Sequence, residues 1–313
     1  MTSHLGHQNT KASTGHLLAL FTILIWGTTF VSTKVLLIDF TPVEILFFRF
    51  LIGYLVLVLI YPRSLRTSSF REECLFIGAG TCGVTLYFLI ENIALVYTTA
   101  SNVGVIVSIA PFFTAVLAHF FLDGEKLTHR FLMGFGIALS GILLIALNGS
   151  FVLQLNPVGD LLAFVAPAVW AIYSVFMRKI GQLGFHTIGA TRKVFFYGLI
   201  FMLPALFLFE FHWELGRFTR LTNLSNLLYL GLGASALCFV TWNRAVNLLG
   251  AMQTSVYIYL VPVITVLSSA LVLREQITWV IVTGAFLTLF GSYISERKAH
   301  KLNNKKNTNP LRG

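Results

Sequence analysis

The chain has 313 residues, of which 56% are hydrophobic and 11% are charged, and its formal net charge is +10. A soluble globular chain carries about 25% charged residues, so this composition excludes a soluble protein and indicates an integral membrane protein. The positive charge does not indicate nucleic-acid binding. Six of the 22 Lys and Arg residues follow Glu296, where a basic tail is typical of a cytoplasmic end beside anionic lipid.

Apolar stretches of about 20 residues, the length that spans a membrane as a helix, follow one another along the chain. The first begins at His16 and is too long for the apolar region of a signal peptide, so we expect an uncleaved helix. The sequence predicts an all-α integral membrane protein with ten transmembrane helices. Their approximate limits are 16–37, 43–61, 73–97, 100–122, 128–147, 157–179, 187–209, 224–248, 251–273 and 277–295.

The two halves of the chain are copies of one unit. Pro111 matches Pro262 at an offset of 151 residues, and Trp26 matches Trp170 at an offset of 144. Such self-similarity indicates a repeat architecture. We therefore expect a first five-helix repeat at 16–147 and a second at 157–295. A cytoplasmic N-terminal segment at 1–15 and a basic cytoplasmic tail at 296–313 flank them.

Basic residues between the helices predict the orientation. With both termini in the cytoplasm, fourteen Lys and Arg face inward, whereas only Arg217, Arg220 and Arg274 face outward. We expect a multi-pass protein of the cell inner (plasma) membrane. Because five is an odd number, the second repeat enters the membrane inverted. Inverted repeats place a substrate site near the midplane and permit alternating access.

Several motifs resemble the EamA family of the drug/metabolite transporter superfamily. They are the Trp26-Gly27 pair, Arg49 within FFRFLIG, the ALVYTTAS junction, Pro111, and FLDGEKLT after it. The resemblance covers about residues 16 to 296. It implies secondary transport, since members export amino acids or take up nucleotide-type metabolites. One departure is that Arg274-Glu275 stands where the family usually has Gly-Glu.

Glu91 is an ionisable residue deep in an apolar stretch, where a charge is costly unless it faces a cavity or a partner. One interpretation is a cavity-lining carboxylate that meets a substrate cation or carries a coupling proton. The other is a fixed ion pair with Arg49 or Arg244. Tyr87 shares a helical face with Glu91. The repeat counterpart of Glu91 is Trp242, so the second repeat has no acidic residue at the equivalent position.

Aromatic and amide side chains complete the candidate substrate site. Trp26 and Trp170 lie at mid-depth, where an interfacial aromatic belt does not account for them, so we expect them to line a cavity. Asn92 and Asn243 are equivalent amides, for which interhelical hydrogen bonds are the favoured interpretation. The candidate substrate-binding residues are Trp26, Tyr87, Glu91, Asn92, Trp170, Tyr173, Trp242, Asn243 and Tyr257.

Prolines, glycines and two acidic residues are expected to shape the helices. Pro111 and Pro262 are expected to bend their helices, as hinges or as fixed kinks. The glycines of Gly78-x-Gly80-x-x-Gly83 spell a dinucleotide fingerprint, but they lie in an apolar stretch and are expected to pack helices closely, as are Gly134, Gly141, Gly284 and Gly291. Glu125 and Glu275 follow helix ends and are expected to cap the next helices.

The inverted repeat predicts alternating access, and the resemblance implies a non-ATP secondary transporter that exports a small metabolite such as an amino acid. The sequence has no Walker motif, metal-ligand spacing or catalytic dyad, so we expect no enzyme activity, catalytic residue, metal or cofactor. The expected partners are a small-molecule substrate, the lipid bilayer, and the proton as a candidate coupling ion. One alternative is uptake or exchange of a larger metabolite such as a nucleotide derivative. A second is a non-transporting membrane sensor or an intramembrane enzyme.

Overall fold

The computed structural model describes residues 2–97, 100–147, 156–209, 211–273 and 278–296, and these residues contain helices but no strand. The all-helical class expected from the sequence is confirmed for this part of the chain. The N-terminal part holds α1 (Thr2–Leu36), α2 (Pro42–Ile60), α3 (Phe70–Gly80), the π-helix η1 (Thr81–Leu86), α4 (Tyr87–Tyr97), α5 (Ala100–Val107), α6 (Ala110–Phe121) and α7 (His129–Leu147).

The C-terminal part of the chain follows after the gap between α7 and α8. It holds α8 (Pro157–Gln182), α9 (Thr187–Leu208), the 3-10 helix η2 (Leu215–Thr219), α10 (Leu221–Leu228), the π-helix η3 (Tyr229–Leu237), α11 (Cys238–Leu249), α12 (Ala251–Ser255), the 3-10 helix η4 (Val256–Leu260), α13 (Val261–Leu273) and α14 (Trp279–Glu296).

Six helical stretches are long and apolar enough to cross a membrane: Ala12–Leu36, Pro42–Ile60, Phe70–Tyr97, Pro157–Gln182, Thr187–Leu208 and Leu221–Leu249. Shorter apolar helices cover Ala110–Phe121, His129–Leu144, Ala251–Thr265 and Val282–Ser295. The chain is therefore a multi-pass membrane protein. The count of ten spans and the two five-helix repeats stay predictions. Helix α1 begins at Thr2, so it includes most of the segment expected to precede the first span.

Polar residues and a glycine set the limits of several helices. The hydroxyl of Thr41 accepts a hydrogen bond from the Glu44 N–H at 3.4 Å, and the Glu44 carboxylate accepts one from the Thr41 N–H at 2.8 Å. This reciprocal pair is a capping box at the start of α2, and Pro42 occupies the first turn without loss of a helical bond. Helix α11 ends before Gly250, whose φ of 99° favours glycine.

The two expected proline disturbances are confirmed as breaks in the helices. Helix α5 ends at Val107 and α6 starts again beside Pro111, while 3-10 helix η4 precedes α13 and Pro262. Proline lacks the N–H that would continue the helical bonding and clashes with the preceding turn. The chain therefore departs from regular α-helix at matching positions of its two parts.

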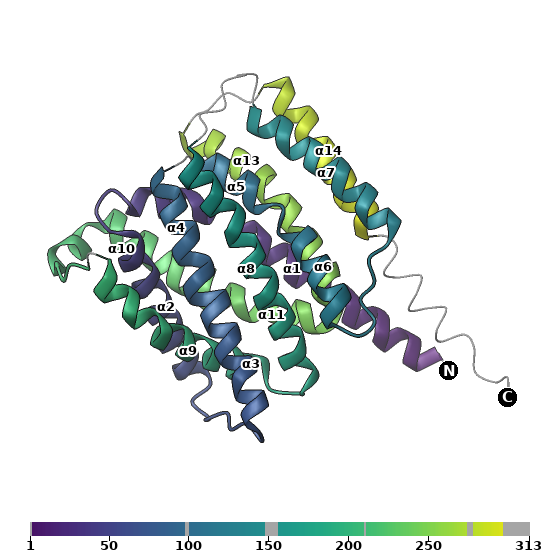
Figure 1. Ribbon diagram of the computed structural model, residues 1–313, viewed down its shortest axis with the longest axis horizontal. Helices are drawn as coiled ribbons and strands as arrows, with labels where there is room; N and C mark the ends of the chain where they lie inside the picture. Colours follow the sequence, from purple (N-terminus) through teal and green to yellow (C-terminus); the bar gives the residue numbers. More distant parts are fainter. Residues whose placement is uncertain (1, 98–99, 148–155, 210, 274–277, 297–313) are drawn as a thin grey trace.

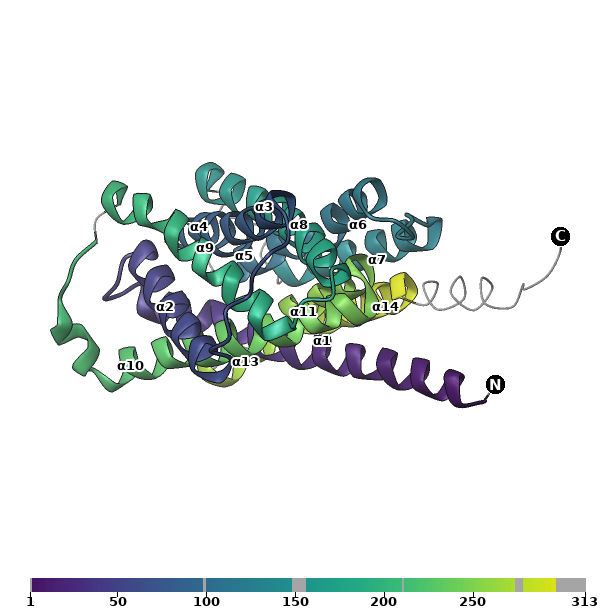
Figure 2. The ribbon, with the colours of Figure 1, turned by 90° about the horizontal axis from the view of Figure 1, so that it is seen from below.

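Helices from the two parts of the chain interleave (Figure 1). Helix α1 packs on α11, α4 on α8, and α3 on α9, while α7 and α14 lie side by side at one edge. Figure 2 shows α1 running along one face beneath the other helices. A buried aromatic cluster around Phe50, Phe195 and Phe239 fills the interior, with ring centroids 5.0 to 5.6 Å apart.

Glycines allow this close packing, as the sequence predicts. A Cβ on Gly134 would stand 2.6 Å from the Gly291 carbonyl oxygen, and one on Gly141 would stand 2.5 Å from the Gly284 carbonyl oxygen. Gly80 meets the backbone of α9 in the same way, 2.7 Å from the Val194 carbonyl oxygen. Backbones can approach this closely only where no side chain intervenes.

The capping prediction for Glu125 is wrong, and that for Glu275 lies outside the described residues. Helix α7 is capped by Thr128, whose hydroxyl accepts a hydrogen bond from the first turn at 3.2 Å. The Glu125 carboxylate instead accepts the Ala251 N–H at 2.9 Å and lies 3.6 Å from Nε of Arg178. The N-cap residue of α12 is Gly250, which has no capping side chain, so the Glu125 carboxylate satisfies N–H groups of that helix start that would otherwise lack a partner.

Candidate functional site

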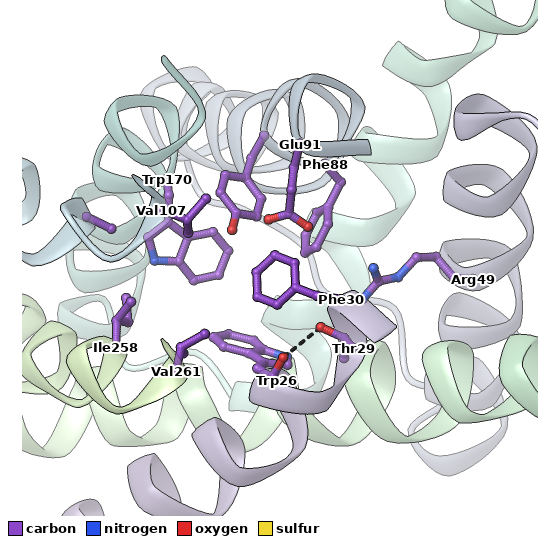
Figure 3. Close-up of a pocket in the computed structure, with 12 residues that line it drawn as sticks. Trp26, Thr29, Phe30, Arg49, Phe88, Glu91, Val107, Trp170, Ile258 and Val261 are labelled. Atoms are coloured by element: carbon purple, nitrogen blue, oxygen red, sulfur yellow. Dashed lines mark hydrogen bonds between the residues drawn. The ribbon is translucent and has the colours of Figure 1, made fainter. Parts of the chain in front are cut away.

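A cavity lies among α1, α2, α4 and α8, at the two proline-associated breaks (Figure 3). Its volume is about 40 Å³, which is room for a few water molecules. All lining residues except Trp26 and Thr29 are buried. The lining consists of Trp26, Thr29, Phe30, Arg49, Tyr87, Phe88, Glu91, Val107, Ala110, Trp170, Ile258 and Val261.

Equivalent positions of the two parts of the chain form the apolar wall. Trp26 and Trp170 meet edge to face, with ring centroids 5.3 Å apart. Val107 and Ile258 are related by the offset of 151, and so are Ala110 and Val261. These aliphatic residues lie at the two helix breaks, where backbone outside a regular helix lines an internal cavity, as membrane proteins require. The cavity is therefore built from residues at matching positions of the two parts of the chain.

Hydrogen bonds and ring contacts hold the indoles in place. Trp26 donates its Nε1–H to the Ala234 carbonyl oxygen at 2.9 Å, and its ring lies 5.0 Å from that of Trp242. Trp170 contacts the Tyr87 and Tyr173 rings at 5.0 and 4.8 Å between centroids. The Trp170 Nε1–H is buried and has no hydrogen-bond partner in the described part of the chain. The cavity thus retains one unused donor on its wall.

Glu91 and Arg49 bring opposite charges to the cavity from α4 and α2. Their side chains are 5% and 1% exposed, which leaves the cavity as their route to solvent. The Tyr87 hydroxyl acts on the Glu91 carboxylate as a hydrogen-bond donor, and the Arg49 guanidinium acts on it through its charge. No ion pair within 4.0 Å joins Arg49 and Glu91, both of which the structure describes. Arg244, the other candidate partner of Glu91, is exposed.

Four of the nine candidate residues line the cavity: Trp26, Tyr87, Glu91 and Trp170. The other five lie around it.

Asn92 donates a hydrogen bond from Nδ2 to the Pro42 carbonyl oxygen at 3.1 Å, and Tyr173 donates one to Oδ1 of Asn243 at 2.8 Å. Trp242 is 1% exposed and packs on Trp26. Tyr257 is hydrogen-bonded to His16 at 2.7 Å. The asparagines thus make the interhelical bonds that the sequence favours.

Most of the cavity lining was not among the candidate residues. Thr29 and Phe30 follow Trp26 by three and four residues, so helical spacing could have placed them on its face. In the sequence, Arg49 is a residue of the family motif and a candidate ion-pair partner of Glu91, but it is not among the candidate substrate-binding residues. The aliphatic residues at the helix breaks carry no chemical signal of their own, although their repeat offset could have marked them. Among the described residues, no cluster of three His, Cys, Asp or Glu side chains is placed to hold a metal.

The apolar helices define a multi-pass membrane protein, and its interior holds a cavity lined by two ionisable groups. The model of the EamA-like transporter family matches residues 13–147 and 157–296. The chain belongs to this family, and it is therefore a member of a family of membrane transporters. The resemblance seen in the sequence is confirmed.

Relatives with similar sequences are also named as transporters, and a solved structure shares the fold. An uncharacterized transporter of Archaeoglobus fulgidus is 29% identical over 290 residues, covering 91% of this chain and 98% of the relative. A probable terminal-alkyne amino-acid exporter of Streptantibioticus cattleyicolor is 24% identical over 278 residues, covering 88% and 91%. A solved crystal structure shares the fold with a TM-score of 0.72 at 20% identity, covering 93% of this chain and 99% of that one.

Proposed function

We propose that this protein exports a small amphipathic metabolite, such as an amino acid, by alternating access and without ATP. The observation that carries the proposal is the cavity between the two parts of the chain, where apolar rings surround one acid and one base. Intramembrane ionisable residues that face a cavity mark substrate or ion pathways. The Streptantibioticus relative, a probable exporter of an amino acid, supports this class of cargo.

The proposed architecture is ten membrane-spanning helices in two inverted five-helix repeats. We place the protein in the plasma membrane, with both termini in the cytoplasm. The basic residues outside the helices support this orientation. A reporter fused after Arg66 should face the cytoplasm, and one fused after Phe211 should face the outside. Both reporters on the same side of the membrane would contradict the inverted arrangement.

Contacts between the two parts of the chain support alternating access. In the proposed orientation, Glu44 lies at the outer end and pairs with Arg217 at 2.8 Å. Glu125 lies at the inner end, where it binds the start of α12 and pairs with Arg178 at 3.6 Å. Rocking one repeat against the other requires contacts at each end that can break in turn. Polar contacts suit this role better than a continuous apolar core does.

Counterflow in proteoliposomes tests the proposal. Vesicles loaded with an unlabelled amino acid should take up the same labelled amino acid saturably, whereas a sensor or an enzyme would show no exchange with any metabolite. Trp26→Ala and Trp170→Ala should lower the rate by at least about tenfold, because each removes a wall of the site. Trp279→Ala is the matched control, since Trp279 is 85% exposed and does not line the cavity. Normal exchange in both cavity variants would show that these indoles only pack the interior.

A further inference from the structure

Arg49 is a buried base whose hydrogen-bonding capacity is largely unused. Its guanidinium carries five N–H donors. Within the described residues, the single hydrogen bond that it makes runs from Nε to the Ser235 hydroxyl at 3.1 Å. The flat group stands 4.4 Å from the centroid of the Phe88 ring. A base that is 1% exposed inside a membrane protein is costly unless a partner meets its remaining donors.

Glu91 presents the complementary group to the same cavity. Figure 3 shows its carboxylate pointing into the space from one wall, while Arg49 extends toward the space from another. Because the two charges do not form a direct ion pair, each keeps acceptor or donor capacity for a third party. A ligand that carries both a cation and an anion would satisfy both residues together.

From this arrangement we infer that the cavity selects a zwitterion with an apolar side chain: Arg49 binds its carboxylate, Glu91 binds its ammonium group, and the ring-lined wall holds the side chain. This inference rests on the proposed function and specifies the recognition chemistry of the same site. Arginine binds a carboxylate through two parallel hydrogen bonds. The ammonium group is stabilised by cation–π interactions with the nearby aromatic faces of Tyr87 and Trp170 as well as by the charge of Glu91.

Two other ligand classes fit the site less well. An organic cation would meet Glu91 but would place a second positive charge beside the buried Arg49. An organic anion would meet Arg49 but would repel the Glu91 carboxylate. Each would leave one charged residue desolvated and unpaired, which costs more than the missing contact alone. A zwitterion adds no net charge to the membrane interior.

Binding of three related probes to the purified full-length protein tests the inference. They are L-phenylalanine, phenethylamine, which lacks the carboxylate, and 3-phenylpropionate, which lacks the ammonium group. The wild-type protein should bind phenylalanine at least about tenfold more tightly than either analogue, because each analogue strands one buried charge. This comparison needs no variant. Equal binding of all three probes by the wild-type protein would overturn the inference.

Arg49→Gln should abolish the preference for phenylalanine over phenethylamine without weakening phenethylamine, whose retained binding shows that the variant is folded. Glu91→Gln should abolish the preference over 3-phenylpropionate in the same way. If Arg49→Gln does not fold, Arg49→Lys serves as the second variant. It keeps the charge but loses the two parallel N–H donors, so it should still reduce the preference for phenylalanine over phenethylamine. An unchanged preference in the Arg49 variant overturns the zwitterion assignment while leaving the proposed export intact. A wild-type protein that binds no amino acid at all overturns both.

Discussion

Glu44→Gln is expected to destabilise the protein by about 2–4 kcal/mol, because it removes the charge from a fully buried carboxylate that joins the two parts of the chain. Glu44 is 0% exposed and accepts hydrogen bonds from Arg217 at 2.8 and 3.1 Å. It also accepts the His212 N–H at 2.6 Å. The expected loss is smaller than for a fully buried pair, since the Arg217 side chain is 15% exposed.

The thermal midpoint of the purified protein measures this effect. Glu214→Gln is the matched control, because Glu214 lies 3.7 Å from the same Arg217 but its side chain is 71% exposed. The control should shift the midpoint little, as exposed ion pairs contribute little. Equal midpoints for the Glu44 variant and the control would show that this contact does not hold the two parts together.

A neighbouring acid extends the same contact between the two parts of the chain. A hydrogen bond from Asn223 is the largest cause that holds the pKa of the Asp39 carboxyl below its usual value, and Arg220 lowers this pKa further. Glu44 in turn raises the pKa of Arg217, chiefly through its hydrogen bonds. Because the folded-state pKa of Asp39 is lowered, its contribution is present above the ordinary aspartate pKa and is lost as the pH falls through the folded value.

The fold class could be predicted because apolar runs of membrane-spanning length leave few alternatives to helices. Breaks at Pro111 and Pro262 were predictable from proline chemistry, and the close approach at Gly134 from the absence of a side chain. Repeat offsets correctly paired Trp26 with Trp170. These properties are local, or they recur in the sequence at a fixed offset, so one sequence suffices to find them.

The sequence could not show which polar residues meet across the interior. Asn243 stands among the candidate site residues with interhelical bonding as its favoured role, but the partners of its amide, Tyr173 and the Thr191 hydroxyl at 3.0 Å, come only from the structure. Glu125 looked like the cap of the next helix, but it binds the start of α12, 126 residues away. Such pairings depend on tertiary packing, and a single sequence does not contain the distances that decide them.

Glu91→Gln is expected to abolish gradient-driven accumulation while leaving substrate exchange in place. The carboxylate is the acidic group lining the cavity, so it can hold either a proton or the ammonium group of a substrate. Competition between these two cations at one carboxylate would couple proton entry to substrate exit, and such coupling is reciprocal. Glutamine keeps the shape but cannot be protonated, so it removes the link. It should also weaken binding of the substrate cation, which makes saturating substrate necessary for the exchange assay.

Proteoliposomes with an imposed pH gradient measure both activities in one preparation. For the variant, the accumulation ratio should fall to about one, because no gradient would then drive the substrate. Counterflow at saturating substrate should continue, with a raised KM. Glu214→Gln, which changes an exposed acid outside the cavity, should accumulate substrate as the wild type does. Retained accumulation by the Glu91 variant would exclude the coupling role. Loss of folded protein that a second change at Arg49 restores would instead identify the two residues as a structural pair.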